Sequence, residues 1–201
     1  AVIDAFTLGI AGALTAGGSG VGAAIGGAGS GSGNSVTNTI EAKVKGSSLT
    51  TGGNVRLEAE DDSTIEALAG SAAVTISAGN STNVAVGLGL SITINDIDND
   101  VLAIIDDSDV DSGGNVTLSA LSTAEIDATA FGAAVSVAAG SSTSVAVGAT
   151  GTVADNSITN TIRAGIEDSD TATANTVSVD GKLSLEASDD STIGAFGFAG
   201  S

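Results

Sequence analysis

Apolar and polar residues alternate along much of the chain. Val55, Leu57 and Ala59 share one parity, whereas Arg56 and Glu58 take the other. The pattern continues with apolar Ile65, Ala67 and Ala69 against charged Glu60, Asp62 and Glu66, and it recurs at Ile40, Ala42 and Val44 against Glu41, Lys43 and Lys45. A period of two is typical of β-strands with one buried face. We therefore expect an all-β fold whose apolar face is buried and whose charged face is exposed.

Three short blocks recur at a nearly constant spacing. They read N-S-V-T-N-T-I at 34–40, N-V-R-L-E-A at 54–59 and S-T-I-E-A at 63–67. Ile3, Ile65, Ile126 and Ile193 occupy one phase of a repeat whose period is about 61 residues. The last interval is longer because six residues are added between Asp170 and Lys182, near Thr171. A fixed period of this kind is the signature of a repeat architecture.

The repeat predicts a single parallel β-solenoid, or β-helix, over residues 1–201. We expect repeats at approximately 1–62, 63–123 and 124–190, and the start of a fourth at 191–201. Both ends fall at the same phase, which suggests a fragment of a longer array or one unit of an end-to-end polymer. The Gly-rich run at 17–33 could be a flexible linker. It occupies a phase filled by ordinary residues in the next repeat, so we interpret it as a Gly-tolerant coil.

The size of one coil has two interpretations. A shift of about 19 residues places Val74 and Ile76 on the inward parity of Val55 and Leu57, which favours coils of about 19–23 residues. About ten such coils would form a rod of roughly 50 Å. The alternative is one wide rung of about 61 residues. The turn at 106–114 would contain the positive φ angles, at its Gly-Gly pair.

Composition narrows the function. Asp and Glu outnumber Lys and Arg by 24 to 5, giving a net charge of −19, so we expect no nucleic-acid partner. The chain contains no Cys, and hence no disulfide. Charge-free stretches at 5–40, 67–95 and 128–154 are long enough for a membrane-spanning helix, but they are rich in Gly, Ser and Thr. We therefore expect no membrane span, and the first residues do not resemble a signal peptide.

Taken together, the blocks resemble the repeat region of giant leukotoxin-family and haemagglutinin-like filamentous adhesins of Gram-negative bacteria. The resemblance rests on N-x-[IV]-x-N-[TD]-[IV], a Gly-Gly turn, V-x-L-x-A and S-T-I-x-A, and it covers nearly the whole chain. It implies an extracellular β-helical rod at the bacterial cell surface.

Catalysis is poorly supported by the sequence, and we expect no enzyme. The absence of His and Cys removes the usual nucleophile–base pairs. Paired carboxylates such as Glu58 and Glu66 could in principle act on glycosidic bonds. Outward charges on strands are far more often a solvated face.

Calcium is the best hypothesis for a small ligand, and we expect no other cofactor. Hard oxygen ligands that lie close together suit Ca²⁺. The candidates cluster within one repeat: Asp98, Asp100, Asp106, Asp107, Asp109 and Asp111, with Asp96 beside them and Asp168 and Asp170 at the corresponding place in the next repeat. No EF-hand spacing accompanies them, so an acidic solvated turn is the competing interpretation.

Asparagines repeat at two phases and predict a structural ladder. One set is Asn34, Asn95 and Asn156, and the other is Asn38, Asn99 and Asn160. Stacked side-chain amides can hydrogen bond along a solenoid and satisfy one another. Contact with a carbohydrate is the functional alternative.

The sequence therefore predicts a structural repeat segment of an extracellular fibre or adhesin. Its expected partners are flanking repeats or copies of itself, end to end, and beyond them a cell-surface glycan or another cell. The competing hypothesis is a Ca²⁺-dependent or glycan-binding β-helical module.

Overall fold

The protein is described by a computed structural model that covers residues 1–168 and 176–201. It is all-β with parallel sheets, as predicted, and this arrangement is compatible with a β-solenoid. The residues added near Thr171 lie outside the described part. The strands are β1 (Val2–Gly17), β2 (Gly22–Lys45), β3 (Ser48–Thr51), β4 (Val55–Asp61), β5 (Thr64–Gly79), β6 (Asn83–Asp106), β7 (Asp109–Ser112), β8 (Val116–Ser122), β9 (Glu125–Gly140), β10 (Ser144–Glu167), β11 (Val177–Val179), β12 (Leu183–Asp189) and β13 (Thr192–Gly200).

Strands of equal phase lie side by side in four sheets, ordered β1-β5-β9-β13, β10-β6-β2, β11-β7-β3 and β12-β8-β4. Ile3 lies opposite Ile65, which lies opposite Ile126, which lies opposite Ile193. Identical blocks therefore stack on one another, because parallel pairing places the same side chain on the same face of each strand.

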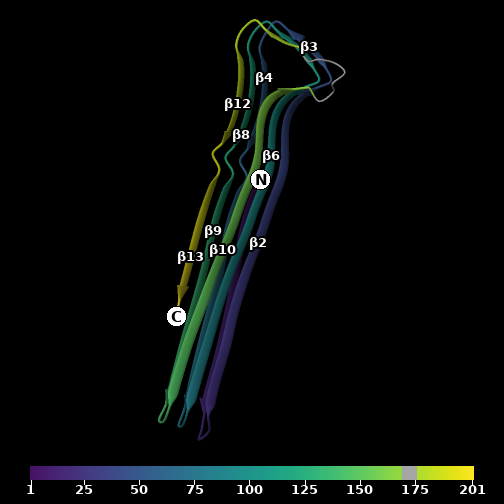
Figure 1. The fold of residues 1–201 in the computed structure, drawn as a ribbon. Coiled ribbons are helices and arrows are strands. Elements are labelled where there is room, and N and C mark those ends of the chain that lie inside the picture. The colour runs from purple at the N-terminus through teal and green to yellow at the C-terminus, as the bar shows by residue number, and fades with distance from the viewer. Residues whose placement is uncertain (169–175) are drawn as a thin grey trace.

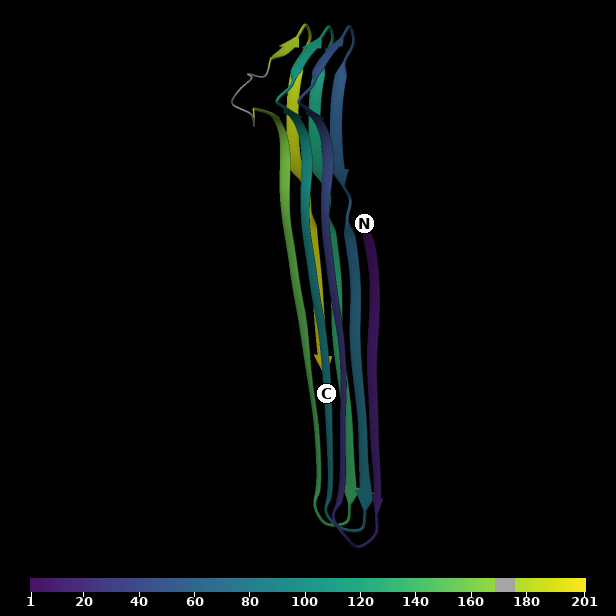
Figure 2. The same cartoon turned by 90° about the vertical axis from the view of Figure 1, so that its right-hand side faces the viewer.

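The finer shift, which would place Val74 on Val55, corresponds to no strand pair among residues 1–168 and 176–201. Cross-strand partners are instead 61 residues apart, as in Asn34 and Asn95, or 67 apart across the longer interval, as in Asn115 and Lys182. No pairing among the described strands therefore supports the short coils or the rod of ten coils. The molecule is long because its strands are long, as Figures 1 and 2 show, and only three or four strands stack in each sheet.

The upper part of the molecule in Figure 1 encloses an apolar core between three sheets. Val101 and Ile105 of β6, Val110 of β7, and Val116 and Leu118 of β8 are all at most 1% exposed. They pack in one cluster, to which β4 contributes its own apolar parity. The expectation that Val55 and Leu57 face inward is confirmed here. This is the upper of two apolar core clusters.

The turn that joins β6 to β7 differs from the prediction in its backbone. Positive φ occurs there at Asp107 (48°), and at Gly46 (57°) in the corresponding turn between β2 and β3, but not at Gly113 or Gly114 between β7 and β8. Gly114 is constrained by space instead, because a Cβ there would collide with the Asn54 side-chain oxygen. Close stacking of successive turns therefore explains this glycine better than left-handed geometry does.

Below the core, the molecule narrows to two sheets that run to a tip, as Figure 2 shows. Here the inward positions hold small residues, among them Ser71, Ala73, Thr75 and Ser77 of β5 and Ala85, Gly87, Gly89, Ser91 and Thr93 of β6, all buried. The large apolar residues face outward, so the predicted inward placement of Val74 and Ile76 is wrong. Val74 is 44% and Ile76 39% exposed.

Close packing of the two sheets explains this reversal. A Cβ on Gly89 would lie 3.1 Å from the Ala133 carbonyl oxygen, and one on Gly87 would lie 2.9 Å from Ser136 Oγ. Only small side chains fit between backbones that approach so closely. Hydroxyls then join the two sheets, since Ser136 donates to the Val147 carbonyl at 2.7 Å.

The Gly-rich run at 17–33 is a strand over most of its length, in agreement with the interpretation as a coil. Its residues from Gly22 onward belong to β2, which pairs with β6 along all 24 positions. Within the described ranges there is no helix long and apolar enough to cross a membrane.

Candidate functional site

The first asparagine set forms a continuous chain of hydrogen bonds. The Asn34 amide donates to the Asn95 side-chain oxygen, and the Asn95 amide donates to that of Asn156, each at 2.7 Å. Asn95 is 1% exposed and is thus satisfied as both donor and acceptor. Its position on β6, between β2 and β10, gives it one partner on each side. The arrangement orients the amides along the stack, with their polar groups directed at one another.

The second asparagine set binds across the molecule instead of along it. Asn99 is fully buried, and its amide donates to Asp61 Oδ2 at 2.9 Å and to Ser63 Oγ at 3.3 Å. Asn160 donates in the same way to Ser122 Oγ at 3.1 Å. One feature does run along the stack, because the Asn38 backbone N–H donates to the Asn99 side-chain oxygen at 2.9 Å.

This polar layer lies where β4 ends and β5 begins. Asp61 is only 3% exposed, and Ser63 donates to its Oδ1 at 2.6 Å. Asn99 lies in sequence between Ile97 and Val101, which belong to two separate core clusters. Buried polar groups of this kind must be hydrogen bonded to be tolerated. The layer therefore holds the bend in the chain and separates the upper core from the lower one.

The six calcium candidates do not converge on one point. Asp98 and Asp100 are exposed on β6, and Asp109 and Asp111 are exposed on β7. Asp107 is half-buried in the turn between these two strands. Over residues 1–168 and 176–201, no group of three or more carboxylates has a geometry that could hold a metal ion.

Asp106 differs from the other candidates because it is buried and bound to cations. It is 2% exposed, and its Oδ2 lies 3.2 Å from Lys43 Nζ and 3.1 Å from Lys45 Nζ. The hydrogen bond with Asp106, reinforced by charge attraction, raises the pKa of Lys45 above its ordinary value of 10.5. Two ammonium groups at this carboxylate occupy the place that a metal ion would need.

Glu58 and Glu66, the two carboxylates considered for glycoside chemistry, have different surroundings. Glu58 receives two hydrogen bonds from Arg56, at 3.0 Å from Nε and 2.6 Å from the terminal nitrogen. These hydrogen bonds and the attraction of the guanidinium lower the pKa of Glu58 from 4.5. A general acid needs a raised pKa, so the contact with Arg56 makes Glu58 a poor candidate for that role.

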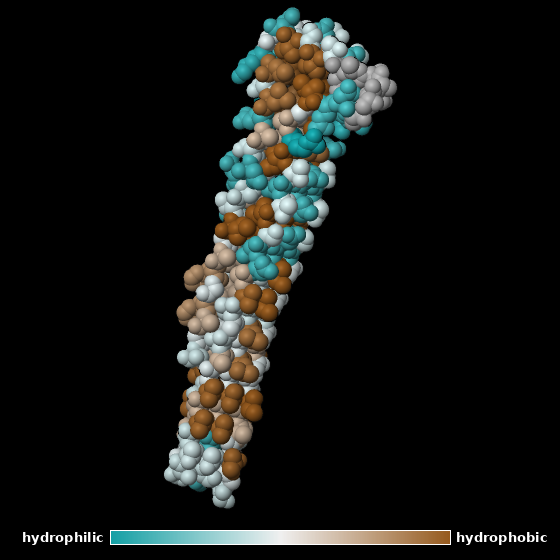
Figure 3. Space-filling model, in the orientation of Figure 1, coloured by the Kyte–Doolittle hydropathy of each residue, from teal (hydrophilic) through white to brown (hydrophobic). Residues whose placement is uncertain are grey.

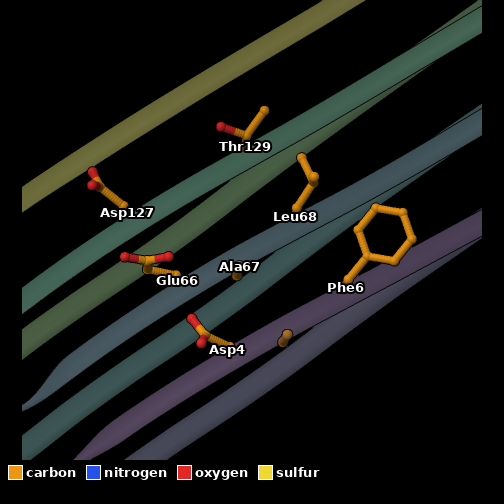
Figure 4. A pocket seen from close by; sticks show the side chains of 8 residues that line it. Asp4, Phe6, Glu66, Ala67, Leu68, Asp127 and Thr129 are labelled. Carbon is orange, nitrogen blue, oxygen red and sulfur yellow. The ribbon is translucent and has the colours of Figure 1, made fainter.

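Glu66 contributes to an open depression of about 450 Å³ on the outer face of β1, β5 and β9. Asp4, Glu66 and Asp127 lie opposite one another on these three strands. Figure 4 shows their carboxylates in a row, with Phe6, Leu68 and Thr129 beside them. The row could have been found from the sequence, because all three follow the isoleucine of the recurring I-x-A block. It can attract cations at the surface.

The described side chains thus form two buried amide systems and an acidic surface, and no catalytic constellation was recognised among them. Comparison of the chain with protein-family models, curated proteins and solved structures gave no match.

Proposed function

We propose that this chain is a structural segment of an extracellular bacterial fibre or adhesin, built as a β-solenoid with about 61 residues per rung. The observation that carries the proposal is the stacking of Ile3, Ile65, Ile126 and Ile193 in one sheet. Solenoids in which each repeat contacts only its neighbours are extended supports, and their stability accumulates along the array. The function proposed is reach and rigidity.

The outermost strands supply the means of extension. β2 and β10 stand at the two edges of their sheet, and each is 24 residues long. Long edge strands present unpaired backbone groups that pair readily with further strands. A flanking repeat, or the end of another copy, would continue the sheet with the same residue columns.

The adhesin assignment rests on the resemblance of the blocks to filamentous adhesin repeats. The acidic composition supports it, because a net charge of −19 keeps an exposed surface soluble.

A tandem chain tests the proposal. Ala1 and Ser191 occupy the same position of the repeat. Thr64 N–H donates to the Ala1 carbonyl of the neighbouring strand, and Thr192, the residue after Ser191, donates in the same way to the Ala124 carbonyl. A second copy that begins at Ala1 directly after Asp190 should therefore continue the stack. Small-angle scattering should show an unchanged longest dimension and a roughly doubled stack height, at about 4.8 Å per strand. Thermal unfolding should be a single transition at a higher temperature than that of one copy.

The matched control is a tandem chain whose second copy begins at Val21, which breaks the phase of the repeat. It should scatter as two separate bodies. If the in-phase tandem also scatters as two bodies, with no increase in melting temperature, the solenoid proposal is wrong.

A further inference from the structure

The outer face of the lower half carries exposed apolar side chains that the fold does not use. Leu90 is 59% and Ile94 53% exposed. We call this surface the β6 flank, and its members are Leu88, Leu90, Ile92 and Ile94 of β6, Val145, Val147 and Val153 of β10, and Ile25 of β2. Figure 3 shows apolar colour along the lower half of the molecule and in a second patch near its top, while hydrophilic colour occurs mainly in the upper and middle parts.

Charge is absent from this flank over most of its length. In β6 the first charged residue is Asp96, and in β10 it is Asp155. Beyond Asp96, the carboxylates of Asp98 and Asp100 follow on the same outward parity. One molecule thus combines an uncharged apolar half with an acidic half along the same strands.

The extent of the flank suits a protein interface. From Val84 to Ile94 the strand covers about 36 Å, and three strands cover about 14 Å, so the flank measures about 500 Å². Exposed apolar patches of several hundred Å² mark interaction sites. Two such flanks in contact would bury about 1,000 Å² in total, which is the lower limit for a specific interface.

We propose that the β6 flank docks against the same flank of a second copy, with the strands of the two copies antiparallel. Charge decides the orientation. If the strands ran parallel, the acidic halves of both copies would face each other, and their carboxylates would repel one another. Antiparallel docking centred on Leu90 places Ile94 opposite Val86 and Asp98 opposite the tip turn at Thr82.

The surface at the centre of the flank accepts such packing. Leu90 lies in register between Gly29 and Gly151, so small residues adjoin it on both neighbouring strands. The nearest atom to a Cβ on Gly29 would be a backbone oxygen at 3.9 Å, which leaves a hollow there. Identical flanks have identical column spacings, so the ridges of one copy can enter the hollows of the other.

This lateral contact is separate from end-to-end extension, which uses backbone groups at the strand edges. Side chains of the β6 flank point out of the sheet and do not take part in edge pairing. An anionic membrane is a less suitable occupant than a second copy, because the net charge of −19 repels it.

Sedimentation velocity over a range of concentrations tests the proposal. The wild type should form a weak dimer whose proportion rises with concentration, because the interface lies at the lower limit of size. The double variant Leu90→Thr/Ile94→Thr keeps β-propensity and should weaken the dimer at least tenfold. The matched control, Val74→Thr/Ile76→Thr, makes the same change on the opposite flank and should dimerise as the wild type does. A monomeric wild type, or equal effects of the two double variants, would overturn the proposal.

Cysteine cross-linking then tests the orientation, since the natural chain has no Cys. Oxidised Leu90→Cys should give a covalent dimer, and Asp98→Cys should give none. Cross-linking through both positions would indicate parallel strands and contradict the proposed arrangement. Flotation with neutral phosphatidylcholine vesicles distinguishes a lipid occupant. Binding to vesicles by a protein that stays monomeric without them would overturn the second-copy proposal.

Discussion

The Asn99 side-chain amide reaches across the interior and donates a 2.9 Å hydrogen bond to the carboxylate of Asp61. Both residues are almost completely buried, so the carboxylate depends on protein donors in place of water. Removal of the amide by Asn99→Ala should lower the free energy of unfolding by about 2–3 kcal/mol, because it takes away a buried hydrogen bond and leaves the buried Asp61 oxygen without that donor.

Urea unfolding measures this effect, with Asp98→Ala as the control. Asp98 is the exposed neighbour of Asn99 on the same strand, and its removal should change the stability by less than about 0.5 kcal/mol. Equal losses for the two variants would contradict the role assigned to the buried layer.

The amide column at Asn95 makes a prediction that depends on pH. Asn95→Asp replaces a donating amide with a carboxylate that faces the Asn156 side-chain oxygen at 2.7 Å in the wild type. Burial raises the pKa of the new carboxyl in the folded state, so its destabilisation is present above that pKa and relieved as the pH falls through it. At pH 7 the loss should be about 2 kcal/mol or more. Thermal melts between pH 4 and pH 8 should show the gap from the wild type narrowing toward low pH.

The Lys45–Asp106 pair predicts a loss of stability at alkaline pH. Because the folded-state pKa of Lys45 is raised above 10.5, the contribution of this lysine is complete below that value and disappears as the pH rises through the folded pKa. The variant Lys45→Gln should lack this part of the alkaline decrease in melting temperature. Asp106 keeps Lys43 at 3.2 Å in the variant, so the comparison isolates one ammonium group. If the melting temperatures of the wild type and of Lys45→Gln decrease in parallel at alkaline pH, the contribution predicted for Lys45 is wrong.

Two glycines of the same sheet should respond oppositely to substitution. A side chain at Gly89 meets the Ala133 backbone oxygen, whereas nothing lies within 4 Å of a Cβ built on Gly27. Gly89→Val should cost about 1–3 kcal/mol through overpacking. Gly27→Val should be neutral or stabilising by about 0.5 kcal/mol, because a strand glycine loses chain entropy on folding. Denaturant unfolding of both variants checks the thin interior of the lower half.

Calcium should act on this protein as a general screening cation. The candidate carboxylates are dispersed, and the buried one is bound to lysines, so we expect EDTA to leave the melting temperature unchanged. Added Ca²⁺ and Mg²⁺ at equal ionic strength should raise it equally, by reducing repulsion between acidic groups. A shift caused by calcium alone would support the calcium-dependent alternative instead.

The recurring blocks of the sequence by themselves determined much of the fold. The alternation of Val55, Leu57 and Ala59 with charged residues identified strands and their buried face in the upper half, where large apolar side chains fill the core. The phases of Asn34 and Asn95 identified partners that lie one strand apart. Both inferences succeed because parallel stacking repeats the same residue at the same position.

The coil size and the lower half were decided by the tertiary structure. A chain rich in Val, Ala and Ser matches itself at many shifts, so the sequence could not separate a short coil from a wide rung. Alternation also leaves open which parity faces inward. At Val74 and Ile76, two closely spaced backbones admit only small residues between them, and the large apolar side chains are therefore turned to the outside. The distance between the two sheets, which no local pattern encodes, made that choice.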